Sequence, residues 1–457
     1  MIRLLLTKYW VLAHLMVTAG ILCFVPNLPV GFGLWAAAAL LMMAWMLPPV
    51  LRGESFWMAR SRAGRVLRAD VVLWSGLLAA AYLGVQLANG PRELVYEPEL
   101  RRWLFTDAPM QFLPSSVHPG SGAGVLVGLL AGVVSATVIR TVLPRKQRLH
   151  LLLGLALSAG FCGAVAAAWA AITGAVPVFE ALGGTFDASV LWLLMFCVSL
   201  GIVGETFLEG HRKTLGVALG AAFLCLFSIF AFAPIEVLGV TLFLAVVYLV
   251  FAGVAVQRSG RYPRILWTLA LMLPVIFAMA AGLAATPGHV SPWAQFNPDS
   301  WKPVMEAFSD QWGFRNGLAF KVFAVEPMLG AGPDGFAEMA RFFLKGKGAW
   351  ALWRAGGTAI PCDFVRLLTE CGMIGTLLLL IPGTAMVLRC LMHWAEFRQN
   401  SRKLYSFRYI FVFSGTLAGV ICVLLASLVG TPLHTPAVLC AFMTVCATMS
   451  GWMPRPR

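Results

Sequence analysis

Runs of about 20 apolar residues recur along the chain, separated by short charged clusters or by Pro and Gly. A helix needs about 20 such residues to cross the roughly 30 Å hydrocarbon core of a bilayer, where its backbone polar groups have to be bonded within the segment. Of the 457 residues, 60% are apolar and only 12% are charged. Because no long polar tract offsets this composition, we predict an all-α polytopic membrane protein.

The apolar runs predict about twelve transmembrane helices in two groups. Residues 1–285 carry nine spans and residues 366–457 carry three, with a large hydrophilic loop at 286–365 between the groups. Ionisable residues are scarce within the spans, and polar groups concentrate in the loop. The predicted spans are 9–25, 30–50, 70–88, 122–143, 150–173, 188–208, 215–233, 235–256, 265–285, 366–391, 409–428 and 436–453.

Basic residues alternate between successive connections, which predicts the orientation because Lys and Arg favour the cytoplasmic side. With both termini inside, the connection 89–121 is acidic and lies outside, as does the loop 286–365. The N-terminal segment lacks a small-x-small cleavage site and is interpreted as a retained helix. The inner segments carry Arg3 and Lys8, then clusters at Arg52–Arg68, Arg145–Arg148, Arg212–Lys213, Arg258–Arg264 and Arg398–Arg408, and finally Arg455 and Arg457.

The net charge of +14 would suit a polyanion binder, but most Lys and Arg residues fall in these inner segments. Anionic headgroups and insertion bias account for them there, so we predict no nucleic-acid partner. The ten cysteines include no Cys-x-x-Cys pair and give no metal signature. Cys362 and Cys371 would lie about 13 Å apart on a helix, too far for a disulfide.

Two parts of the loop are candidates for chemistry. Residues 312–326 predict a short helix whose apolar stripe leaves Arg315 and Lys321 to the side. The following segment, 327–336, has three glycines and two prolines and predicts a compact turn. Gly330 and Gly332 would also permit close approach of a phosphate, although a plain turn between two surface helices is favoured.

Beyond this turn, basic and aromatic side chains share one segment. Such a mixture is typical of an amphipathic helix at a membrane interface, which is the favoured interpretation. The alternative is that Arg and Lys bind the diphosphate of a lipid-linked donor, for which the planar guanidinium of Arg is suited. The residues are Glu338, Arg341, Lys345, Lys347, Phe342, Phe343, Trp350 and Trp353.

Three features resemble the O-antigen ligase and polysaccharide polymerase superfamily of bacterial envelope membrane proteins. The first is about twelve spans with one large external loop before the antepenultimate span. The second is the string from Arg315 to Phe336, similar to the family's Arg, apolar helix and Pro-Leu-x-Gly-x-Gly-Pro-x-x-Phe. The third is DFVRLLTECGMIG at 363–375, which leads into 377–380 and is similar to the start of the family's next span.

The resemblance implies a metal-independent glycosyltransferase without a cofactor, in the inner membrane of a bacterium. A glycan would move from undecaprenyl diphosphate to an acceptor hydroxyl on a lipid or polysaccharide, at the outer face. Cationic groups would stabilise the departing diphosphate, and a base would take the acceptor proton. Arg315 matches the family's functionally important loop arginine, and Asp363 matches a motif position.

The chain also departs from the family at two places. Pro361 and Cys362 stand where a His-Asn pair is usual, and Glu236 stands where a second arginine is typical. Rebuilt catalytic groups, a different acceptor or binding without turnover would each explain these losses. With a rebuilt site in view, the catalytic candidates are Arg315, Asp363, Glu236 and His434, and the substrate-binding candidates are Arg341, Arg354, Lys321, Gly330 and Gly332.

Two other classes of function remain open beside the glycosyltransferase. One is a transporter or flippase for a lipid-linked substrate, which predicts broken helices at matching positions in two halves. The other is a non-catalytic protein that binds glycan lipids. Glu97-Pro98-Glu99 gives a weaker indication of a metal-dependent glycosyltransferase.

Overall fold

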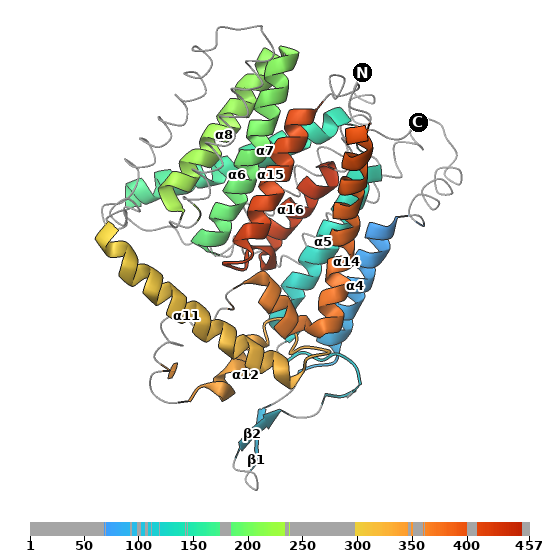
Figure 1. Cartoon of the computed structure of the whole chain (residues 1–457), viewed down its shortest axis with the longest axis vertical. Coiled ribbons are helices and arrows are strands. Elements are labelled where there is room, and N and C mark those ends of the chain that lie inside the picture. Colours follow the sequence, from blue (N-terminus) through green and yellow to red (C-terminus); the bar gives the residue numbers. More distant parts are fainter. Residues whose placement is uncertain are drawn as a thin grey trace.

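The computed structural model is a bundle of long helices with smaller elements at one end (Figure 1). It describes residues 68, 70–91, 94–97, 102–105, 108–110, 112–117, 119–141, 143, 145–173, 184–233, 237, 298–345, 349–350, 360, 362–399 and 409–449.

Eight predicted spans coincide with described helices. Six of these helices are long and apolar enough to cross a membrane, and the last two are shorter apolar helices, which confirms a multi-pass helical architecture. The predicted spans 9–25, 30–50, 235–256 and 265–285 lie outside the described residues. The eight helices are α4 (Val71–Ala88), α5 (Pro119–Thr141), α6 (Arg145–Thr173), α7 (Thr185–Glu209), α8 (Arg212–Phe232), α14 (Asp363–Gln399), α15 (Ile410–Ala426) and α16 (Pro436–Met449).

Helix α7 lies at the centre of the bundle and packs against α8 and α15. Its Trp192 is fully buried, and the indole N–H donates to the carbonyl oxygen of Ala159 on α6 at 3.0 Å. Where α7 crosses α15, a Cβ on Gly415 would lie 2.7 Å from the Cα of Gly201. Small residues let helix backbones approach this closely in lipid, where dispersion replaces the hydrophobic effect as the attraction.

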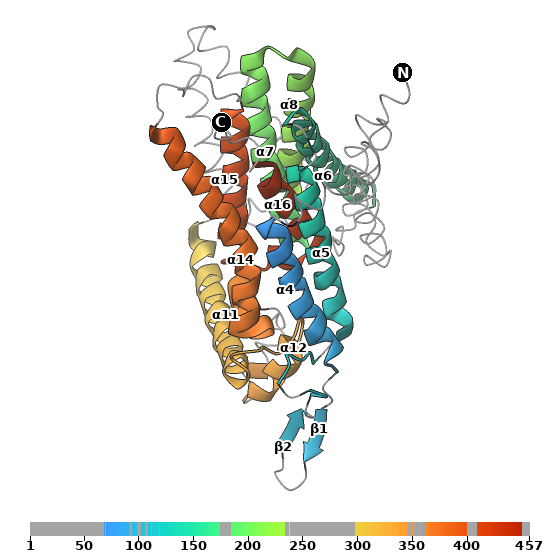
Figure 2. The same cartoon turned by 90° about the vertical axis from the view of Figure 1, so that its right-hand side faces the viewer.

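The hydrophilic elements gather at one end of the bundle, opposite the turn between α7 and α8 (Figures 1 and 2). They are α11 (Pro298–Val325), α12 (Phe336–Ala340), the 3₁₀ turn η3 (Arg341–Phe343) and a hairpin of β1 (Leu94–Glu97) and β2 (Arg102–Phe105). The described part of the connection 89–121 therefore lies at the same end as the described part of the large loop, as the charge alternation predicts. That this end is the non-cytoplasmic one stays a prediction.

Two elements differ from the expectation. The helix expected at 312–326 already begins at Pro298, and proline is common at the first position of a helix. The all-α prediction also left out the antiparallel hairpin, in which Leu94 pairs with Phe105 and Glu97 with Arg102. Its strands are only four residues long but rich in Val, Tyr, Trp and Phe, which favour extended backbone.

Helix α14 is interrupted at Gly372, whose φ is 64° and ψ is −173°. The break removes the helical partners of nearby backbone groups, and the predicted turn at 327–336 supplies new ones. The four bonds run from Ala331 N–H to Thr369 O (2.9 Å), from Gly332 N–H to Glu370 O (2.8 Å), from Met373 N–H to Pro327 O (2.9 Å) and from Ile374 N–H to Met328 O (3.2 Å).

Glycine is required at this junction. A Cβ on Gly330, where φ is 76°, would lie 2.4 Å from both the carbonyl oxygen of Glu370 and the amide nitrogen of Gly372. We predict that Gly330→Ala destabilises the protein by about 2 kcal/mol through left-handed backbone strain alone, with the clash adding to it. Thermal unfolding of the purified protein in detergent measures the change.

Gly317 on α11 provides the matched control. It is exposed, and a Cβ there would meet nothing within 4 Å. Gly317→Ala should leave the melting temperature equal or raise it, because alanine favours a helix by about 1 kcal/mol. Equal melting of Gly330→Ala and the parent would contradict the packing described for the turn.

Candidate functional site

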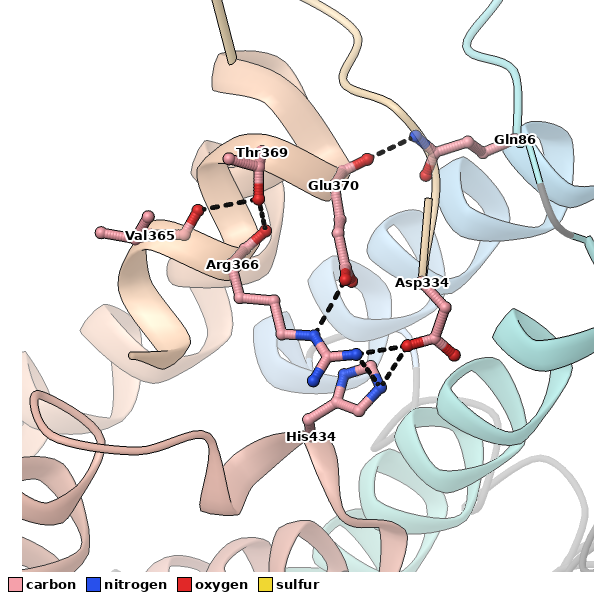
Figure 3. A network of polar contacts seen from close by, with 7 residues as sticks. All are labelled: Gln86, Asp334, Val365, Arg366, Thr369, Glu370 and His434. Carbon is pink, nitrogen blue, oxygen red and sulfur yellow. Dashed lines mark hydrogen bonds and ion pairs between the residues drawn. The ribbon is translucent and has the colours of Figure 1, made fainter. Parts of the chain in front are cut away.

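A guanidinium, an imidazole and two carboxylates meet beside the break in α14. We name these residues, Arg366, Glu370, Asp334 and His434, the Arg366 cluster (Figure 3). Arg366 Nε donates to Glu370 Oε1 at 2.9 Å, one turn further along α14. Its Nη2 pairs with Asp334 Oδ1 and lies 2.7 Å from His434 Nε2. Residues that are far apart in the sequence thus contact the side chain of Arg366.

The turn that repairs α14 also delivers Asp334 to the cluster. Asp334 follows Gly332 and Pro333 directly and has a left-handed φ of 59°. Gln86 on α4 fixes the turn from the other side, since its Nε2 donates to the carbonyl oxygens of Leu329 (3.1 Å) and Glu370 (2.8 Å). The amide of Gln86 is fully buried, so these bonds join α4, the turn and α14 without access of water.

His434 arrives on a short 3₁₀ turn, η6 (Pro432–His434), between α15 and α16. Asp363, the first residue of α14, holds this turn: its Oδ2 accepts the N–H of Leu433 at 3.0 Å. The N–H of Asp363 in turn donates to the carbonyl oxygens of Ser427 and Gly430, both at 3.0 Å. The start of α14 and the η6 turn therefore form one unit.

The cluster admits two tautomers of His434. When Nε2 is unprotonated, the two hydrogens of Arg366 Nη2 are divided between Asp334 Oδ1 and His434 Nε2. When Nε2 is protonated, it can donate to Asp334 Oδ1 at 3.2 Å and leave Nδ1 to accept a proton, but Nε2–H and Arg366 Nη2 are then two donors 2.7 Å apart, so this tautomer requires the guanidinium to turn away from the ring. The second tautomer is the arrangement of a general base oriented by a carboxylate.

The structure brings two of the predicted catalytic residues together. Asp363 and His434 are neighbours through the η6 turn, as described above. Arg315 lies on α11, which packs against α14 and α12 and buries Leu318, Ala319 and Val322. Partial burial lowers the pKa of the Arg315 guanidinium from its ordinary value, although arginine stays charged in proteins. Glu236 lies outside the described residues.

The substrate-binding candidates lie in different environments. Lys321 is exposed, and Arg341 is about half-exposed and pairs with Glu338 at 3.2 Å. The N–H groups of Gly330 and Gly332 donate to the carbonyl oxygens of Glu326 and Glu370, so these two donors are occupied within the protein. The close approach of Gly330 is to the α14 backbone, and that of Gly332 is to Ser116. Arg354 lies outside the described residues.

Sequence reasoning missed Arg366, Glu370 and Asp334. A signal existed for the first two, because they stand four residues apart at the start of an apolar span, the spacing of an ion pair on one helix face. Asp334 carried no such signal, since its partner lies 32 residues further along the chain.

Comparisons with known proteins do not assign the chain to a family. No protein-family model matches the chain, and no curated protein sequence matches it.

Replacing Arg366, the cation at the centre of the cluster, should destabilise the protein. Glu370 is 6% exposed and Asp334 31%, so Arg366→Gln would leave two carboxylates close together without their cation. We predict a loss of about 3 kcal/mol, part of which returns in the double variant Arg366→Gln with Glu370→Gln. Thermal unfolding in detergent measures both.

Arg341→Gln is the matched control, because that arginine makes an exposed pair with Glu338, its side chains being 52% and 36% exposed. It should change stability by less than about 1 kcal/mol. If Arg366→Gln has the same melting temperature as this control, the cluster does not stabilise the end of the bundle.

Proposed function

We propose that the protein is a membrane glycosyltransferase that moves a glycan from an undecaprenyl-diphosphate carrier to an acceptor hydroxyl, as the resemblance to the O-antigen ligase and polymerase superfamily implies. One observation carries the proposal: His434 Nε2 lies 3.2 Å from Asp334 Oδ1 and beside the Arg366 guanidinium, at the end of the bundle that bears α11 and α12, so a carboxylate that can orient the imidazole stands next to it. The missing motif histidine thus has a substitute within the same unit as Asp363.

The charge of the cluster favours the acceptor rather than the diphosphate. One guanidinium faces Asp334, Glu370 and the nearby charge of Asp363, so carboxylates outnumber cations. A diphosphate would be repelled by this excess in a low-dielectric site. A sugar hydroxyl is neutral, and carboxylates and imidazole are suited to accept its hydrogen.

The diphosphate would then be held on α11. Arg315 is half-buried, and the exposed Lys321 follows it on the same helix. Removal from water strengthens the attraction of a guanidinium for phosphate oxygens, and its fork can bind two of them at once. In this assignment α11 stabilises the leaving group, His434 takes the acceptor proton and Asp334 stabilises the imidazolium.

A transporter for a lipid-linked substrate is the second candidate. The break in α14 and the buried charges of Arg366 and Glu370 favour it, because discontinuous helices and intramembrane charges are typical of transport sites. Such sites lie near the midplane of the membrane. The cluster instead takes its residues from helix ends and turns on the side of α11 and α12 (Figure 1).

Arg315→Ala should lower glycan transfer by about 100-fold, the usual effect of removing one donor that stabilises developing charge. The measurement is transfer from a lipid-linked glycan in a membrane preparation, with protein amount held equal. Gly317→Ala, at the exposed position on the same helix, is the control and should retain most of the activity. Unchanged transfer in Arg315→Ala would contradict the assignment of the diphosphate to α11.

His434→Gln should lower the rate of the same reaction by at least about 100-fold, because general-base catalysis contributes that much, while the KM for the donor changes little. Glutamine keeps a polar group of similar length but takes no proton at neutral pH. His211→Gln, on the opposite turn between α7 and α8, serves as the control. Equal turnover by His434→Gln and the parent would remove His434 as the base.

A further inference from the structure

The η6 turn is held on both sides of His434. On one side Asp363 accepts the N–H of Leu433, as described above. On the other side, the hydroxyl of Thr435 donates to Asp187 Oδ2 at 2.6 Å. Asp187 stands in the first turn of α7, so this bond joins the centre of the bundle to the turn that carries the imidazole.

The bond between Asp187 and Thr435 is short and buried. The exposed fractions of the two residues are 8% and 6%. A charged acceptor in such a place makes a stronger hydrogen bond than a neutral one, and water cannot easily replace it. Thr435 directly precedes α16, where a hydroxyl usually accepts a backbone N–H of its own helix. Here it donates across the bundle instead.

Position matters greatly at His434. Its Nε2 lies 2.7 Å from Arg366 Nη2 and 3.2 Å from Asp334 Oδ1, so a shift of about 1 Å would break the bond that Nε2 makes in either tautomer. We propose that Asp187 is a positioning residue: through Thr435 it fixes the η6 turn and so holds the imidazole of His434 against Arg366 and Asp334. This proposal rests on the proposed function in one respect, which is that His434 acts as the general base.

The test follows the chemical reactivity of His434, which needs no substrate. The full-length protein in membranes is treated with diethyl pyrocarbonate, and the modification rate of each histidine-containing peptide is measured by mass spectrometry. In the parent protein Nε2 is engaged by Arg366, which slows its reaction. His211, whose side chain is 62% exposed on the α7–α8 turn, is the internal reference.

Thr435→Val removes the hydroxyl and keeps the shape of the side chain. His434 should then react about tenfold faster, the factor that corresponds to the loss of one hydrogen bond to a charged group. Thr435→Ser keeps the hydroxyl and should restore the parent rate. Asp187→Ala should accelerate the reaction at least as much as Thr435→Val, since it removes the same bond together with a negative charge close to His434.

Thr416→Val on α15 is the matched control. Thr416 is also buried, but its hydroxyl bonds to carbonyl oxygens of its own helix at Val412 and Phe413. It should leave the reactivity of His434 unchanged. Parent-like reactivity in Thr435→Val, or equal acceleration in Thr416→Val, would overturn the proposal.

A second variant keeps the proposal falsifiable if Thr435→Val does not fold. Asp187→Asn retains an acceptor of the same shape and lowers only its charge, so His434 should react faster than in the parent and slower than in a variant without the bond. In transfer assays Asp187→Asn should lower kcat without changing the KM for the donor. If Asp187→Asn has the His434 reactivity and the kcat of the parent protein, the inference is overturned. Absence of transfer from the parent protein would instead contradict the proposed function, and the reactivity of His434 would still decide this inference.

Discussion

The break in α14 at Gly372 is the constraint on which the described end of the bundle depends. Backbone groups released by a break inside an apolar bundle have to find partners, because unpaired N–H and C=O groups are costly away from water. The turn at 327–332 supplies four of these bonds, and only glycine fits where its backbone meets that of α14. The same turn continues into Asp334, so the repair of the helix also places a carboxylate beside Arg366.

This coupling explains why the polar cluster is compact. Arg366 and Glu370 lie on the short part of α14 that precedes the break, Asp334 lies on the turn, and His434 lies on η6. Each element is bonded to the next through backbone groups as well as through side chains. A buried ion pair gives little net stability over apolar packing, but displacing either partner leaves an unpaired buried charge and strongly destabilises the fold. The cluster is therefore suited to hold one arrangement of an imidazole and a cation.

The charge distribution gives the two faces of this end different chemistry. Carboxylates outnumber cations around Arg366, whereas residues 312–325 of α11 carry Arg315 and Lys321 and no acidic residue. A reaction that separates an anionic leaving group from a neutral acceptor needs such a division. The proposed transfer assigns the leaving group to α11 and the acceptor to the cluster.

Much of the helical framework could be predicted from the sequence, because an apolar run of about 20 residues in lipid has few alternatives to a helix. The turn at 327–336 was also predictable from its glycines and prolines. Its partner was not, since composition does not reveal which distant backbone a turn will meet. Asp363 and His434 were named for their motif position and their side of the membrane. Their connection through Leu433, like the pairing of Asp334 with Arg366, depends on contacts between distant segments that no local period encodes.

The central claim is that α11 and the Arg366 cluster act at the non-cytoplasmic face. Cysteine labelling in intact cells tests it most directly, with a membrane-impermeant maleimide and two variants at exposed positions, Lys321→Cys on α11 and Lys213→Cys on α8. The account predicts that Lys321→Cys is labelled in intact cells and that Lys213→Cys is labelled only after the membrane is opened. The reverse pattern would place the site in the cytoplasm and contradict the account.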